Sequence, residues 1–218
     1  MHVAVGLTVL LMACGAEAGT ELPKAAAPAG FWEHWGDGRA EVDSYRLTTP
    51  RYGEPREGSA VLVFVTEDFT DAARVKSDGG HGDEYPVLKL NEIRHFQTGL
   101  YDYDVMTSAF VRLDGQAPIG QPVKVSFSAQ EWCGHVYNQL VPRGNGLEQV
   151  GHSYFDGEAD HAGTIPLPKE GVLADALPIL VRGLVGDWPP AGTEVRVPLL
   201  PTLMWSRFAH RPLEWTQT

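Results

Sequence analysis

The clearest candidates for chemistry lie in the short sequence EWCGH, where Cys133 and His135 stand two positions apart. On a strand both side chains point to one face, with Cα atoms about 6.5–7 Å apart, and a bend at Gly134 would bring them closer. A cysteine activated by a histidine is the nucleophile of many hydrolases and transferases. Dithiol exchange is excluded, because Val136 stands where such a motif carries its second thiol. The alternative is a buried structural thiol beside an anchoring Trp132, and this is the role we expect for Cys133.

Three further residues, His152, Asp160 and His161, are candidates for binding a cation. Imidazole and carboxylate groups together with a thiol form zinc sites in proteins. The spacing of these residues matches no zinc motif, and histidines outside such motifs are common. We therefore expect no metal and no other cofactor.

Aromatic side chains give a second kind of candidate site. Tyr101 and Tyr103 share one face of a segment that alternates with a period of two, and Trp132 follows the next alternating segment. These three residues are candidates for contacting an apolar ligand or a partner protein.

The elements that would position these residues are mainly strands. Residues 123–129 alternate cleanly between apolar and polar side chains, and residues 86–98, 100–113 and 147–155 show comparable patterns. Residues 193–198 and 203–210 are also expected to be strands, and residues 48–58 a loop interrupted by two prolines. The main helix is expected within residues 173–186, capped by Asp175, with Pro178 in its first turn. The sequence thus predicts a single, mainly β domain with a curved or partly closed antiparallel sheet.

The N-terminal region resembles that of bacterial lipoproteins. Residues 3–12 form an apolar run with the length of a signal-peptide core, and Ala13 precedes Cys14 as in a lipobox. We expect a signal peptide at 1–13, lipidation of Cys14, a flexible tether at 14–30 and the folded domain at 31–218. The alternative is an ordinary secretory signal that is cleaved after Ala13 or near Ala18.

The charge of the chain narrows the range of partners. A formal net charge of −11 argues against binding of nucleic acid and against electrostatic adhesion to anionic lipid. The expected location is the bacterial cell envelope, on the outer membrane or the periplasmic face, with the membrane contacted through the lipid anchor.

Several longer motifs resemble a family of bacterial lipoproteins without an assigned activity: FWEHWGDGRAE, YRLTTPRYGEPREG, VLVFVTEDF, YPVLKLNEIRHFQTGLYDYDVMTSAF, SAQEWCGH and HSYF. Members of this family sometimes carry the label "septum formation inhibitor Maf", although the Ser-x-Ser-x-Arg-Arg type motif of the Maf pyrophosphatases is absent here. The resemblance implies an envelope protein and specifies no reaction. We expect a binding or scaffold domain rather than an enzyme, and a Cys-dependent hydrolase or transferase centred on Cys133 and His135 is the alternative.

Overall fold

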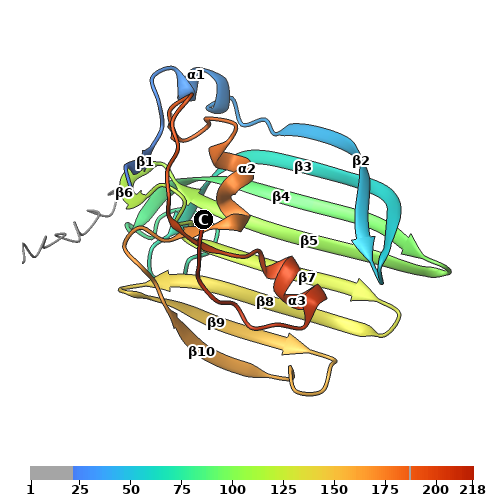
Figure 1. Cartoon of the computed structure of the whole chain (residues 1–218). Helices are drawn as coiled ribbons and strands as arrows, with labels where there is room; N and C mark the ends of the chain where they lie inside the picture. The colour runs from blue at the N-terminus through green and yellow to red at the C-terminus, as the bar shows by residue number, and fades with distance from the viewer. Residues whose placement is uncertain (1–21, 187) are drawn as a thin grey trace, which may run out of the picture.

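The computed structural model describes residues 22–186 and 188–218, and it is built around one large antiparallel sheet (Figure 1). The sheet has eight strands in the order β10-β9-β8-β7-β5-β4-β3-β2, so β2 and β10 are its open edges. These strands are β2 (Glu41–Arg51), β3 (Glu54–Thr70), β4 (Glu84–Thr98), β5 (Tyr101–Arg112), β7 (Lys124–Glu131), β8 (Gly134–Arg143), β9 (Gly146–Ser153) and β10 (His161–Pro166). Neighbouring strands follow one another along the chain except at β5 and β7, where β6 (Asp114–Pro118) intervenes. The predicted fold class is confirmed.

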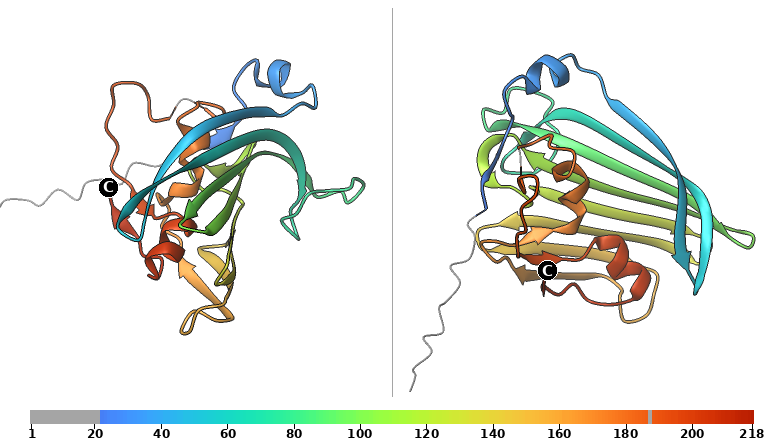
Figure 2. Two further views of the ribbon diagram at one scale, coloured as in Figure 1. Left: turned by 90° about the vertical axis from the view of Figure 1, so that its right-hand side faces the viewer. Right: turned by 45° about the horizontal axis from the view of Figure 1, so that its top comes forward.

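The two faces of the sheet differ as the sequence alternation predicts. Val125, Phe127 and Ala129 on β7 and Tyr103 and Val105 on β5 are buried in one continuous core. Residues between them point to the opposite face, because successive side chains of a strand alternate. We call the buried side the inner face and the opposite side the outer face. Figure 2 shows that the long strands β2 and β3 curve strongly along their length.

The folded part begins earlier than the sequence suggested. Leu22 and Ala25 are buried, and β1 (Lys24–Ala26) pairs with β6. The expectation of a flexible tether over 14–30 is therefore wrong for residues 22–30, whose few apolar side chains are used in packing. The short helix α1 (Phe31–Trp35) plugs the core with Phe31 and Trp35. The signal peptide at 1–13 and Cys14 lie outside the described residues.

The C-terminal segment crosses the inner face of the large sheet (Figures 1 and 2). It contains the 3-10 turn η1 (Ala174–Ala176), the helices α2 (Leu177–Leu180) and α3 (Leu203–Ala209), and a small sheet of β11 (Val172–Leu173), β12 (Pro198–Leu200) and β13 (Thr216–Gln217). The helix expected within 173–186 is thus present as a short one. The strand expected at 203–210 is wrong, since these residues form α3. Only the last residue of the strand expected at 193–198 is in a strand, at the start of β12.

The segment expected to be a loop at residues 48–58 is a hairpin that joins β2 to β3. Tyr52 and Gly53 form its turn with φ values of 56° and 76°, as a two-residue turn of the I′ kind requires. Pro50 lies on the edge strand β2, opposite Pro55. Pro55 precedes the part of β3 that pairs with β4, so neither proline removes a hydrogen bond from the interior of the sheet. None of the described helices is long and apolar enough to cross a membrane.

Candidate functional site

A groove of about 450 Å³ opens on the inner face, between the β2–β3 hairpin and α3. We call it the inner groove, and it is lined by residues 47–53, Arg94, Met204, Trp205, Phe208 and Ala209. Leu47, Thr49 and Arg51 occupy alternate positions of β2, so their side chains share the inner face. The α3 helix supplies the facing wall, most of which is apolar.

Arg51 and three aromatic rings form one end of this groove. The Arg51 guanidinium carbon lies 4.4 Å from the ring centroid of Tyr52 and 4.4 Å from that of Phe208. Arg51 Nη1 donates a hydrogen bond to the carbonyl oxygen of Phe208 at 3.1 Å, and Nη2 donates to the hydroxyl of Tyr52 at 3.3 Å. The hydroxyl groups of Tyr52 and Tyr103 are 2.8 Å apart. The hairpin turn is thereby fixed against both the sheet and α3.

Contacts at both ends hold α3 against the sheet. At its start the Thr202 hydroxyl accepts a hydrogen bond from Trp205 N, as an N-cap does. The buried carboxylate of Asp175 accepts a second bond, from Leu203 N at 3.1 Å. Asp175 does not cap its own helix as expected, because it lies inside η1 and reaches α3 instead. Near the end of α3, Glu158 from the β9–β10 connection pairs with Arg207.

Three ionisable groups lie at or below the inner groove: Arg94 has a carboxylate partner, and burial raises the pKa of Tyr103 and of Asp175. Arg94, on β4, is paired with Glu92, with Nε and Oε1 2.8 Å apart. Burial and the nearby Glu131 raise the pKa of Tyr103, so its phenol stays protonated. Burial also raises the pKa of Asp175 to about 7, against the lowering effect of the Leu203 N–H.

A second depression of about 460 Å³ lies on the outer face. We call it the outer groove, and it is lined by residues 104–106, 128–130 and 135–137, together with Ile93 and His152. His135 lies opposite Gln130, and Tyr137 lies between Ser128 and His152 in the strand register. His152 Nδ1 is 2.9 Å from an oxygen of Asp160. Two of the predicted histidines, His135 and His152, therefore line the same surface.

The predicted nucleophile lies in a turn, and the predicted base lies on the strand that follows it. Cys133 is exposed in the tight turn between β7 and β8, and no hydrogen bond joins it to His135. The expectation of a buried structural thiol is wrong, because the strand alternation of β7 ends at Glu131, before the cysteine is reached. The turn also exposes Trp132, whose ring packs edge-on against Tyr101 at 4.6 Å.

The other predicted residues fall in different places. Tyr103 is buried below the inner groove, stacked on Phe96 at 4.9 Å. His161 Nδ1 lies 3.3 Å from the carbonyl oxygen of Ala159. Within residues 22–186 and 188–218, no three histidine, cysteine or acidic side chains gather closely enough to hold a metal ion.

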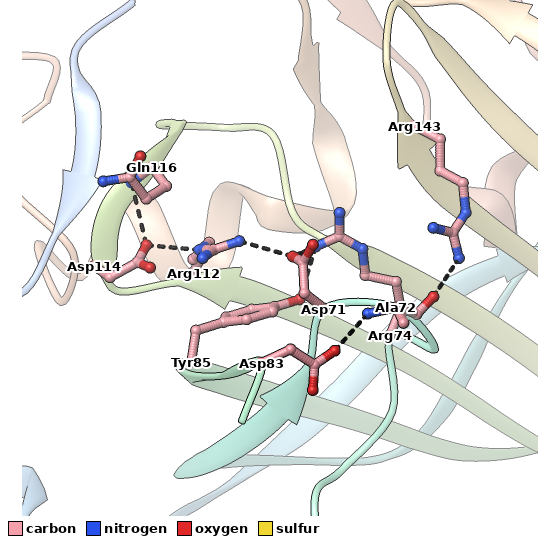
Figure 3. A network of polar contacts seen from close by, with 9 residues as sticks. All are labelled: Asp71, Ala72, Arg74, Asp83, Tyr85, Arg112, Asp114, Gln116 and Arg143. Carbon is pink, nitrogen blue, oxygen red and sulfur yellow. Dashed lines mark hydrogen bonds and ion pairs between the residues drawn. The ribbon is translucent and has the colours of Figure 1, made fainter. Parts of the chain in front are cut away.

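A network of charged residues occupies the opposite end of β3 (Figure 3). Asp71 pairs with both Arg74 and Arg112 at 3.0 Å, and Arg112 also pairs with Asp114 at 2.7 Å. Arg112 lies over the ring of Tyr85, 3.8 Å from its centroid. These bonds fix the β3–β4 connection to the end of β5, and each of the two arginines has a carboxylate partner.

Comparisons of the chain with models of protein families, with curated proteins and with solved structures give no match. The lining residues of the inner groove were not among the sequence candidates. The signal that could have found them is the sequence Arg51-Tyr52-Gly53, in which a charged and an aromatic residue directly precede a turn glycine.

Proposed function

We propose that this chain is a lipid-anchored protein of the bacterial cell envelope whose β domain binds an apolar ligand in the inner groove. The anchor is Cys14, and the family is that of the bacterial lipoproteins whose motifs the chain resembles. Cys14→Ala should move the protein from the membrane fraction to the soluble fraction. Continued sedimentation with membranes would show that another contact holds it.

The observation that supports binding is the character of the inner groove. Its volume of about 450 Å³ falls in the range of roughly 300–1,000 Å³ that is usual for small-molecule sites. Met204, Trp205 and Phe208 give it an apolar wall, and Trp205 remains 43% exposed. A large apolar side chain that stays exposed beside a concave apolar surface favours contact with a ligand.

The walls of the inner groove are also suited to binding rather than to catalysis. Arg51, Arg94 and Tyr52 are the ionisable side chains that line it. The arginines are neither nucleophiles nor general bases at neutral pH, and the Tyr52 hydroxyl is hydrogen-bonded to Arg51 and Tyr103. The Thr49 hydroxyl has no histidine or carboxylate beside it in the groove, and the Thr48 hydroxyl donates a hydrogen bond to Glu57, which does not line the groove. Binding without chemical conversion is the function that this composition supports best.

A fluorescent titration tests this function. The neutral dye N-phenyl-1-naphthylamine should brighten when it enters the inner groove, because its emission rises in apolar surroundings. Ala209→Trp places a bulky side chain in the inner groove and should weaken binding by about ten-fold or more. Ser128→Trp adds the same bulk to the outer groove and should leave the affinity unchanged.

Two results would contradict the proposal. Loss of binding in Ser128→Trp with retention in Ala209→Trp would assign the ligand to the outer groove. The absence of any dye enhancement with the wild-type protein, up to the solubility limit of the dye, would exclude an apolar binding site.

A further inference from the structure

Arg51 is an unusual residue to find at the end of an apolar groove. It is 9% exposed, and its guanidinium lies between the rings of Tyr52 and Phe208, which both line the inner groove. A guanidinium remains charged at every physiological pH. Arg51 therefore brings a permanent positive charge to the edge of a largely apolar surface.

The hydrogen bonds of Arg51 leave this charge without a counter-ion. Of its five N–H donors, the two bonds found in the structure go to neutral oxygens, those of Phe208 and Tyr52. Arg51 Nε is buried and has no partner. Among the described residues, no carboxylate forms an ion pair with Arg51; the hydroxyl groups of Tyr52 and Tyr103 separate it from Glu131.

Two neighbouring arginines, unlike Arg51, each have a carboxylate partner. Arg94, which lines the same groove, is paired with Glu92, and Arg207 on α3 is paired with Glu158. A charge removed from water without a partner is costly, and a buried arginine normally has a carboxylate or phosphate beside it. The helix end supplies partial compensation, because the last carbonyl groups of α3 carry negative partial charge.

We propose that the ligand of the inner groove is a single-chain amphiphile with a carboxylate head group, which Arg51 binds while the chain lies along Met204 and Trp205. This inference rests on the binding function proposed above. A carboxylate matches the planar donor fork of an arginine. A monoanion also matches the single uncompensated positive charge, whereas a doubly charged phosphate would need a second free cation. The volume of the groove suits one chain rather than the two of a phospholipid.

A series of ligands that share a twelve-carbon chain tests the head group. Laurate, dodecanol, dodecyl phosphate and dodecyltrimethylammonium would each compete with N-phenyl-1-naphthylamine, at pH 8, at fixed ionic strength and below their micelle concentrations. Laurate should displace the dye at a concentration about 10- to 100-fold lower than dodecanol, because a hydrogen bond to a charged group adds to the contact of the chain. The trimethylammonium compound should compete more weakly than dodecanol.

Variants of Arg51 assign this preference to one side chain. Arg51→Gln should bring laurate to the level of dodecanol. Arg51→Lys should keep only part of the preference, because an ammonium group supplies the charge without the planar donor fork. Arg46→Gln is the matched control, because it removes the same charge from an exposed position of β2 whose side chain lies on the other face. If Arg51→Gln fails to fold, the wild-type series still tests the carboxylate preference. The Lys variant then tests whether this preference depends on the Arg51 guanidinium.

The failure of this inference is distinguishable from the failure of the proposed function. Equal displacement by laurate and dodecanol, with the dye bound normally, would overturn the carboxylate preference and leave apolar binding intact. Tighter binding of dodecyl phosphate than of laurate would overturn the choice of carboxylate. Loss of the preference in Arg46→Gln would overturn the assignment to Arg51. If the dye itself does not bind, the apolar site and its head-group preference both fall.

Discussion

At the scale of single residues, Asp175 connects the segment below the groove to the groove wall. Its carboxyl is buried, accepts a hydrogen bond from Leu203 N at the start of α3, and lies near Glu92 and Arg94. Burial raises its pKa to about 7, so the carboxyl is protonated in the folded state over a pH range in which it is ionised in the unfolded chain. The folded state consequently binds an additional proton between about pH 4 and pH 7.

This difference predicts a pH dependence of stability. The contribution of Asp175 is fully present below about pH 4 and is lost as pH rises to about 7, up to about 4 kcal/mol. Asp175→Asn stays neutral, so its free energy of unfolding relative to wild type should increase by up to that amount from pH 4 to pH 8. Chemical denaturation at several pH values measures this. Asp78→Asn, which removes an exposed carboxylate, is the control, and a wild-type to Asp175→Asn difference that is flat with pH would contradict the assignment.

Among single residues, the sequence was least informative about the site. It identified His135 and His152, which line the outer groove, because histidine is a common catalytic base and metal ligand. It missed Arg51, whose partner Phe208 is 157 positions away along the chain. No local pattern reports a contact over that distance. The burial of Cys133 was wrongly inferred because alternation was extended past the last residue of β7 into a turn.

At the scale of elements, most strands of the large sheet were predicted well, whereas the short helices and the strands of the C-terminal segment were predicted poorly. The alternation in β5 and β7 has one clear period, so the buried faces could be read directly. The α3 helix has only seven residues, and an apolar run of that length fits a helix or a strand equally well. Its one local signal was Thr202, an N-cap residue directly after a proline.

The β2–β3 hairpin was missed because of its two prolines. Two prolines within a few residues indicate a loop in most contexts. Here Pro50 and Pro55 are paired with each other at the end of an edge hairpin, where the missing N–H groups cost little. Only the complete strand order shows that β2 is an edge strand. The residues around the two prolines therefore do not reveal that the prolines lie at an edge. The hairpin matters for function because it carries Arg51 and Tyr52 to α3.

At the scale of the whole molecule, the open antiparallel sheet presents two different surfaces. The inner face is mostly filled by the C-terminal segment, which leaves the inner groove at one end of β2 and β3. The outer face has a depression of similar volume with histidine and tyrosine side chains. The sequence predicted a curved antiparallel sheet, but the path of the C-terminal segment decides where a concave surface remains.

The central claim, that the ligand occupies the inner groove, is tested most directly by methyl NMR of methionine. Among the four methionines, Met204 lines the inner groove and Met106 lines the outer groove, so each groove holds its own reporter. In protein labelled with ¹³C at the methionine methyl groups, titration with laurate should shift the Met204 signal in a saturable way and leave Met106 unchanged. A saturable shift of Met106 with no change at Met204 would contradict the account.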